Sequence, residues 1–277
     1  MNSNNKVAVV TGGSGVLGRE FCHALAKQGY KVAILGRDLG SGEKLADEIR
    51  QNGGVALAVA ANVTDKASLE SAAALIEQQL GKCDLLLNGA GGNHPKGTSS
   101  EEYYTEEISH KENATSFFDL DPEGIDFVFK LNFMGTLLPS QVFGKQMLDK
   151  AHATIINISS MSALCPLTKI PAYSAAKAAV NNFTQWLAVH FAKTNIRVNA
   201  IAPGFFLTQQ NYNLLKTSDG GWTPRAEKII AHTPMSRFGE SQELIGTLLW
   251  LADEKASGFV NGVVIPVDGG FAAYAGV

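Results

Sequence analysis

The chain has 277 residues, of which 45% are hydrophobic and 18% charged, and its formal net charge is −3. This length and apolar content suit a single α/β domain, residues 1–277, with a large core. The mild acidity argues against a nucleic-acid partner, which would require clustered lysine and arginine.

Nothing in the chain indicates a membrane or secretory protein. No apolar run approaches the roughly 20 residues that a membrane span needs, and the polar start MNSNNK lacks the features of a signal peptide. Cys22, Cys83 and Cys165 have no metal-ligand spacing, so we expect reduced thiols and no metal. We therefore expect a cytoplasmic protein without a membrane partner.

Short apolar runs rich in β-branched residues alternate with longer segments of helical periodicity. Runs of this kind are typical of strands that are buried on both faces of a parallel sheet. Their alternation with helices predicts a single Rossmann-like, doubly wound α/β fold with helices on both faces of the sheet. The expected strands are residues 7–10, 32–35, 56–60, 85–87, 154–158, 197–201 and 263–267, and the expected helices are residues 19–28, 42–51, 66–80, 126–149, 173–194 and 241–251.

Two segments are longer than a compact domain needs for its connections. Residues 92–124 and 204–233 are polar excursions that follow predicted strands. Long loops of this kind are usually functional, and open α/β sheets bind ligands at the carboxyl ends of their strands. We interpret both segments as substrate-site insertions; the alternative is a mobile surface insertion.

The first predicted strand runs into a glycine-rich turn, VAVVTGGSGVLGRE. Glycines let a backbone approach a pyrophosphate, and the following helix offers its N-terminal N–H groups. The pattern matches TGxxxGxG at its ends, although Val16 occupies the middle glycine position and Gly15 comes one place earlier. The expected cofactor contacts in this turn are Gly12, Ser14, Gly15, Val16, Leu17 and Gly18.

The end of the second strand bears on the choice between NAD and NADP. An acidic residue there would bind the ribose 2′-hydroxyl and repel a 2′-phosphate. This chain has Gly36 followed by Arg37, whose guanidinium suits a phosphate. Asp38 comes one place later and could swing back. Taken alone, this pattern favours NADP(H), although Arg37 could also be a solvated loop residue.

A serine, a tyrosine and a lysine have the spacing of an acid–base site. Ser160 ends a strand 13 residues before Tyr173, and Lys177 follows Tyr173 by four residues. Residues i and i+4 share one face of a helix. We therefore expect the ammonium to lower the pKa of the phenol, so that Tyr173 acts as a general acid or base.

With these motifs the sequence resembles the short-chain dehydrogenase/reductase family over essentially its whole length. The matching segments are TGGSGVLG, NGAGG, LNFMGT, NISS, YSAAK and APGF. The resemblance implies that Tyr173 transfers the proton, that Ser160 holds the substrate oxygen, and that Lys177 binds the nicotinamide ribose. It also implies that Asn132 holds the water of a proton relay.

The resemblance implies further cofactor contacts. Gly89 replaces the second asparagine of the usual NNAG, and Asn62 replaces the usual aspartate beside the adenine. Those substitutions make the adenine contact less certain. The implied contacts are Asn62, Val63, Asn88, Gly89, Ala90, Gly91, Pro203, Gly204, Phe206 and Thr208, with Tyr173 and Lys177 from the catalytic set.

Several of these residues have structural alternatives. Asn132 could only cap or kink its helix, and Thr208 could be a simple loop hydroxyl. Ser159 could face the substrate, although the 13-residue spacing favours Ser160. Cys165 lies near the site without a base partner, so we interpret it as a packing residue.

More extended segments look like the D-mannonate oxidoreductase (fructuronate reductase) branch of this family. They include NGAGGNHPKGT, APGFFLTQQN, HTPMSRFGE and VIPVDGGFAAYAGV. The branch implies the reversible oxidation of D-mannonate to D-fructuronate and is usually linked to NAD(H), which conflicts with Gly36–Arg37. The choice between NAD and NADP therefore stays open. His94 and Lys96 are the expected substrate contacts, because a sugar acid brings a carboxylate; a loop hydrogen bond and a solvated charge are their alternatives.

Other functions are compatible with part of this pattern. One alternative is a different short-chain reductase, of the gluconate 5-dehydrogenase or 3-oxoacyl-carrier-protein reductase type. Another is a non-catalytic nucleotide sensor, which is disfavoured because Asn132, Ser160, Tyr173 and Lys177 are all present. The resemblance also suggests a homotetramer with the C-terminal GGFAAYAGV at a subunit contact.

Overall fold

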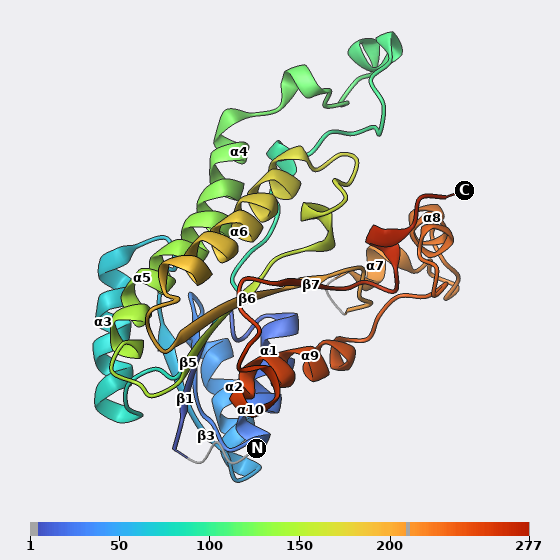
Figure 1. Cartoon of the computed structure of the whole chain (residues 1–277). Helices are drawn as coiled ribbons and strands as arrows, with labels where there is room; N and C mark the ends of the chain where they lie inside the picture. Colours follow the sequence, from blue (N-terminus) through green and yellow to red (C-terminus); the bar gives the residue numbers. More distant parts are fainter. Residues whose placement is uncertain (1–4, 209–210, 277) are drawn as a thin grey trace.

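Seven strands form one parallel sheet in the order β3-β2-β1-β4-β5-β6-β7 in the computed structural model, which describes residues 5–208 and 211–276 (Figure 1). The strand order reverses between β1 and β4, the kind of switch point at which doubly wound sheets bind ligands. The predicted fold class is confirmed. The strands are β1 (Val7–Thr11), β2 (Lys31–Gly36), β3 (Val55–Ala60), β4 (Leu85–Asn88), β5 (Ala153–Ile158), β6 (Ile196–Pro203) and β7 (Val264–Val267).

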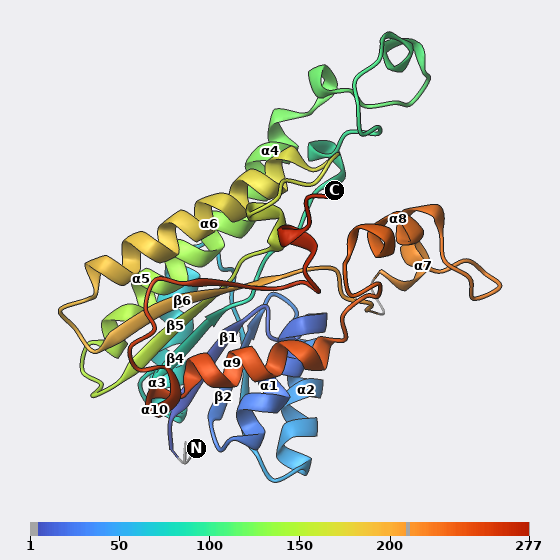
Figure 2. The same ribbon diagram turned by 45° about the vertical axis from the view of Figure 1, so that its right-hand side comes forward.

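The alternation of side chains along each strand divides the core into two layers. In β1, Ala8 and Val10 belong to one buried cluster, whereas Val7 and Val9 belong to the other. Residues of α1 (Val16–Lys27), α2 (Leu39–Gln51) and α9 (Ile245–Ala252) complete the first cluster. Residues of α3 (Lys66–Gln79), α5 (Gly135–Met147) and α6 (Pro171–His190) complete the second. Figure 2 shows α1 and α9 on one side of the sheet and α5 and α6 on the other. Because strands are apolar on both faces, the sheet is buried between these two helical layers.

The helices alternate with the strands as predicted, and some of them begin at a residue whose side chain caps the helix N-terminus. Asp65, for example, begins α3 by accepting hydrogen bonds from the N–H groups of Ala67 and Ser68. Among the described residues, no helix is both long and apolar enough to cross a membrane. The α-helices are α1 (Val16–Lys27), α2 (Leu39–Gln51), α3 (Lys66–Gln79), α4 (Pro122–Phe129), α5 (Gly135–Met147), α6 (Pro171–His190), α7 (Tyr212–Leu215), α8 (Pro224–His232), α9 (Ile245–Ala252) and α10 (Glu254–Ser257).

The single helix expected over residues 126–149 is wrong in one respect, because a π-helical segment interrupts it. This segment, Lys130–Met134, lies between α4 and α5. Its Asn132 is fully buried, and the amide nitrogen of the side chain donates to the Val128 carbonyl at 2.8 Å. A side chain that takes an i−4 carbonyl competes with the helical ladder, which accounts for the widened turn. π-bulges of this kind are frequent at functional sites.

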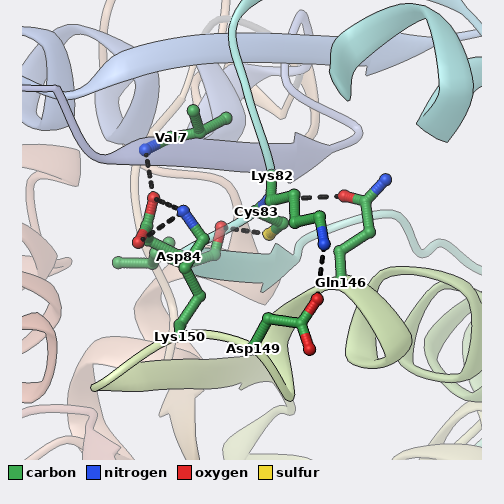
Figure 3. Close-up of polar contacts among 8 residues, drawn as sticks. Val7, Lys82, Cys83, Asp84, Gln146, Asp149 and Lys150 are labelled. Carbon is green, nitrogen blue, oxygen red and sulfur yellow. Dashed lines mark hydrogen bonds and ion pairs between the residues drawn. The ribbon is translucent and has the colours of Figure 1, made fainter. Parts of the chain in front are cut away.

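At the amino-terminal edge of the sheet, opposite the predicted site, Asp84 joins three elements. Its carboxylate accepts from the Val7 N–H at 2.8 Å and pairs with Lys150 at 3.0 Å (Figure 3). The Asp84 side chain is only 10% exposed, whereas the Asp149 side chain, which pairs with Lys82, is 65% exposed. Asp84 therefore holds the start of β1 against β4 and the segment after α5.

Replacing Asp84 with alanine is expected to lower the free energy of unfolding by about 2–3 kcal/mol, because the Val7 N–H and the Lys150 ammonium lose their partner. Urea unfolding followed by circular dichroism would measure the change. Asp149→Ala is the control, and its effect should stay below about 1 kcal/mol because this ion pair is solvated. Equal losses in the two variants would contradict the assigned role of Asp84.

Candidate active site

The turn between β1 and α1 is built from glycines at positions where a side chain would clash. Gly12 has a φ of +65°, and a Cβ there would lie 2.9 Å from the Ala90 Cα. A Cβ on Gly18 would lie 2.2 Å from the Gly12 carbonyl oxygen. Gly15 caps α1 without a side-chain hydrogen bond, and the first turn holds no acidic residue. The helix N-terminus therefore offers backbone donors to an anion, which fits the pyrophosphate of a dinucleotide.

In the loop after β2, the Asp38 side chain is used to cap α2. Its carboxylate accepts hydrogen bonds from the N–H and hydroxyl groups of Ser41 and so caps α2. Arg37 is exposed. Gly36 faces the phosphate-binding turn, since a Cβ there would lie 3.2 Å from the Ser14 hydroxyl oxygen. Asp38 is thus engaged at the start of α2, whereas Arg37 stays exposed beside Gly36.

Asn62 and Val63 follow β3, and the Asn62 side-chain oxygen already has hydrogen-bond donors within the chain. The Asn62 side-chain oxygen accepts from the N–H of Thr64 at 3.1 Å and from its hydroxyl at 2.9 Å. The side-chain nitrogen of Asn62 is the part left to meet an adenine. Val63 is buried, and a Cβ on Gly135 would lie 3.0 Å from its Cγ2. Val63 therefore packs on the start of α5.

The segment after β4 lies against the end of β1. The Thr11 hydroxyl oxygen accepts from the N–H groups of Gly89 and Ala90 at 3.1 and 3.2 Å. A Cβ on Gly89 would lie 2.9 Å from the Thr11 carbonyl oxygen, so a larger residue there would require the backbone to shift. The sequence interpretation missed Thr11, whose place directly before Gly12 was the available signal.

Asn88 connects neighbouring parts of the buried framework. Its side-chain nitrogen donates to the Asn157 side-chain oxygen at 2.9 Å and to the Ser140 hydroxyl at 3.0 Å. Asn157 in turn donates to the Thr184 hydroxyl at 2.9 Å. These bonds tie β4, β5, α5 and α6 together beneath the candidate catalytic residues.

Ser160 and Tyr173 are brought together by the turn that follows β5. Their side chains share a hydrogen bond. The N–H and hydroxyl groups of Ser162 approach the Ser160 hydroxyl oxygen at 3.1 and 3.0 Å. Ser159 is turned toward α6, where it bonds to the Lys177 carbonyl and to Asn181. The geometry thus favours Ser160 over Ser159, and it adds Ser162, whose i+2 spacing was the sequence signal for a bond to Ser160.

Lys177 is buried beneath the tyrosine. Its ammonium lies 5.7 Å from the centre of the Tyr173 ring and donates to the Ile158 carbonyl at 2.8 Å. A Cβ on Gly91 would lie 2.7 Å from the Asn132 side-chain oxygen and 3.1 Å from the Lys177 nitrogen, so glycine leaves room for both groups. The ammonium has further donors for the hydroxyls of a nicotinamide ribose. Burial lowers the pKa of Lys177 to about 8.

The expected depression of the Tyr173 pKa is wrong for the protein without cofactor. Burial raises the pKa of the Tyr173 phenol above its usual value, and the hydrogen bond from Ser160 offsets only part of this effect. The reason is that desolvation disfavours the phenolate. The same burial weakens the proton affinity of Lys177. A phenolate therefore needs interactions that form when the site is filled.

Asn132 joins the π-helical segment to the loop after β4. Its side-chain nitrogen donates to the Gly92 carbonyl at 2.7 Å, and its side-chain oxygen accepts from the Gly92 N–H at 3.2 Å. The Asn132 carbonyl accepts from the Thr136 hydroxyl at 2.8 Å. Asn132 thus shapes its helix and positions the adjacent loop beside Gly91 and Lys177.

His94 and Lys96, the two expected substrate contacts, differ in how many partners they already have within the chain. The Lys96 ammonium lies 2.7 Å from the Asp121 carboxylate and 3.4 Å from that of Glu123. His94 accepts the Lys96 N–H at its Nδ1 at 3.2 Å, and its ring packs 5.0 Å from that of Phe127. The charge of Lys96 is therefore neutralised within the insertion. His94 uses only its Nδ1 to cap the turn Pro95–Gly97, so this bond leaves its Nε2 for a substrate.

The end of β6 carries the remaining predicted contacts. Gly204 follows Pro203 and approaches β7 so closely that a Cβ would lie 2.6 Å from the Asp268 Cα. The Phe206 side chain is 7% exposed and packs under Gly239. Its predicted cofactor contact can involve only the backbone, because core packing buries the ring. The Thr208 N–H donates to the Asn211 side chain at 2.8 Å; residues 209 and 210 of this insertion lie outside the described residues.

Known proteins resemble this chain over most or all of its length. The model of the short-chain dehydrogenase family matches residues 6–219. The uncharacterised oxidoreductase UxuB of Bacillus subtilis is 57% identical, with 100% of this chain and 98% of the relative covered. A solved structure of a proposed D-mannonate oxidoreductase from Haemophilus influenzae, with bound NAD, is 53% identical, has a TM-score of 0.96 and covers 100% of this chain and 98% of its own.

A more distant structure carries the other nicotinamide cofactor. The gluconate 5-dehydrogenase of Burkholderia cenocepacia, in complex with NADP and tartrate, has 26% identity and a TM-score of 0.84, covering 98% of this chain and 97% of its own. The glycine turn, the buried lysine and the paired serine and tyrosine fit a nicotinamide dinucleotide beside an alcohol or carbonyl group. The chain therefore belongs to the short-chain dehydrogenase family and is an NAD(P)-dependent oxidoreductase that acts on CH–OH groups.

Proposed function

We propose that this enzyme interconverts D-mannonate and D-fructuronate. The observation that carries the proposal is the full-length similarity, at 53% identity, to the Haemophilus protein described as a proposed D-mannonate oxidoreductase. His94, at the base of the insertion after β4, supports a hydrophilic substrate, because its Nε2 is not used by the bond to the Lys96 N–H and an apolar steroid or acyl chain would offer this nitrogen no partner.

In the proposed reaction the protein positions the substrate and moves a proton, while the nicotinamide supplies or accepts the hydride. Ser160 donates a hydrogen bond to the reacting oxygen, and the Tyr173 hydroxyl gives or takes the proton at that oxygen. Lys177 binds the ribose and places a positive charge under the Tyr173 ring, 5.7 Å from its centre. We propose that Asn132 holds the water that returns the proton to solvent.

A matched substrate panel tests this proposal. Initial rates would be measured for D-mannonate, D-gluconate, neutral polyols and a 3-oxoacyl thioester, with both nicotinamides in the appropriate oxidation state. We expect the highest kcat/KM for D-mannonate or its keto partner. Higher values for D-gluconate would favour a gluconate 5-dehydrogenase, and higher values for the thioester would favour an acyl reductase. No turnover of any compound would favour a nucleotide sensor.

His94 and Lys96 can be separated as carboxylate partners. We expect His94→Asn to raise KM for D-mannonate roughly tenfold, the effect of one lost hydrogen bond, because asparagine can still cap the following turn. Lys96→Ala should have a smaller effect, since Asp121 and Glu123 already neutralise this ammonium. The amide of D-mannonate is the neutral control. A KM increase specific to the acid in Lys96→Ala alone would transfer the role to Lys96.

Arg37 is the proposed determinant of NADP(H) binding. Arg37→Ala should raise KM for NADPH on the order of tenfold, because a charge-assisted bond is worth about 1.5–3 kcal/mol, and should barely change KM for NADH. Arg19→Ala is the control, since Arg19 is a half-buried arginine of α1 that pairs with Glu48. Equal changes with both cofactors would show that Arg37 does not bind the 2′-phosphate. They would favour NAD(H), the cofactor bound in the Haemophilus structure.

We further propose a cytoplasmic homotetramer in which residues 269–277 meet a neighbouring subunit. Tyr274 is 49% exposed in this segment, and Phe271 packs 5.3 Å from Phe205; Val277 lies outside the described residues. Light scattering after gel filtration would measure the mass, and a monomer would contradict this proposal.

A further inference from the structure

The turn after β5 places a second serine against the hydroxyl of Ser160. Ser160 has an extended backbone, and its side chain caps the short 3₁₀ turn Met161–Ala163. The Ser162 N–H donates to the Ser160 hydroxyl oxygen at 3.1 Å, and the Ser162 hydroxyl donates to the same oxygen at 3.0 Å. Ser162 therefore approaches Ser160 with two donors, one from its backbone and one from its side chain.

Burial leaves the Ser162 side chain little choice of partner. Ser162 is only 1% exposed, and its hydroxyl has no other hydrogen-bond partner among the residues that the structure describes. A hydroxyl that is withdrawn from water costs free energy unless it is paired. The Ser162 hydroxyl is thus engaged with Ser160 before any substrate binds.

The two accepted bonds leave the Ser160 hydroxyl with one remaining function. A serine hydroxyl has two lone pairs and one proton. Ser162 occupies both lone pairs, so Ser160 is left with its proton, and its side chain shares a hydrogen bond with Tyr173. Ser159 cannot replace Ser162, because its own hydroxyl bonds to Asn181 and to the Lys177 carbonyl.

We propose that Ser162 is a positioning residue, which holds the Ser160 hydroxyl as a hydrogen-bond donor toward Tyr173 and the reacting oxygen. The proposal rests on the roles proposed above for Ser160 and Tyr173, but not on the identity of the sugar acid. Hydrogen bonds that follow one another in a chain polarise each other. The bond from Ser162 therefore strengthens the bond from Ser160, which stabilises negative charge on the phenol and on the substrate oxygen.

Ser162→Ala removes one of the two bonds and leaves the turn intact, because the backbone N–H still caps it. The freed lone pair lets the Ser160 hydroxyl rotate away from its donor orientation. We expect kcat to fall roughly five- to tenfold, the effect of about one hydrogen bond, with KM for the nicotinamide unchanged. Rates are measured with D-mannonate or with the fastest compound of the substrate panel, so a different substrate does not affect the test. Unchanged kcat would overturn the proposal.

The pH dependence separates positioning from packing. Without the Ser162 hydroxyl the Tyr173 phenolate loses support, so the apparent pKa for alcohol oxidation should rise. The rate deficit of Ser162→Ala should therefore be largest at low pH and shrink as pH rises. A deficit that is the same at every pH would overturn the proposal.

A double-mutant cycle tests whether Ser162 acts through Ser160. In a chain that already carries Ser160→Ala, the further change Ser162→Ala should alter kcat less than about twofold, because its partner is gone. The same fold-loss in both backgrounds would assign Ser162 to packing and overturn the proposal, as would full activity of Ser160→Ala alone. Ser174→Ala is the matched control, since Ser174 is buried next to Tyr173 and its hydroxyl has no partner among the described residues. Its kcat should equal that of the unaltered enzyme.

Discussion

Replacing Tyr173 with phenylalanine is expected to lower kcat by at least about two orders of magnitude, the usual size of a general acid–base contribution. The ring and its packing remain, so the change removes only the group that shares a hydrogen bond with Ser160. Binding of NADH, measured by fluorescence titration, should change little, because Lys177 and the glycine turn are untouched.

The control for this variant is Tyr104→Phe, which makes the same chemical change on a side chain that is 56% exposed in the insertion after β4. Its kcat should equal that of the unaltered enzyme. The pH dependence gives a second readout, since alcohol oxidation requires deprotonated Tyr173 and should accelerate as pH rises. Near-normal turnover in Tyr173→Phe would remove Tyr173 from the proton-transfer role.

Replacing Lys177 with methionine is expected to make the cofactor-free protein more stable while lowering kcat/KM by at least about two orders of magnitude. Burial lowers the pKa of Lys177 from 10.5 to about 8, so the charged form costs about 3 kcal/mol at neutral pH. Methionine removes this cost but loses the bond to the Ile158 carbonyl, which is worth about 1 kcal/mol. The net gain in the free energy of unfolding should be about 2 kcal/mol.

The pH dependence of this gain has a defined sign. Between pH 8 and pH 10.5 the unfolded chain holds a proton on Lys177 that the folded protein has released. The stability of the unaltered protein therefore rises with pH across this window, and the advantage of methionine should fade there. Denaturant unfolding at pH 7 and pH 10 would measure both effects. Lys145→Met, at an exposed helical position, is the control. Destabilisation by Lys177→Met at pH 7 would contradict the assigned cost of burial.

The sequence alone determined the sheet, the order of its elements and the residues of the catalytic motif. Apolar runs marked the strands because a sheet covered on both faces buries successive side chains, as Val9 and Val10 do on opposite sides of β1. Glycine at positions 12 and 18 marked the phosphate turn because no side chain fits there. The strands and the glycine turn depend on local sterics and on burial, so a short stretch of sequence is enough to predict them.

The hydrogen-bond partners of the polar side chains depend on contacts between segments that lie far apart in the chain. Ser159 and Ser160 are neighbours in the chain, yet one faces α6 and the other Tyr173, since consecutive residues of an extended segment point to opposite sides. Lys96 meets Asp121 and Glu123 because the two ends of the insertion touch at Gly97 and Gly124. The Tyr173 pKa is raised because burial depends on everything packed around the ring. Long-range proximity and desolvation are properties of the folded chain, so a motif can name these residues but cannot assign their partners or their charge.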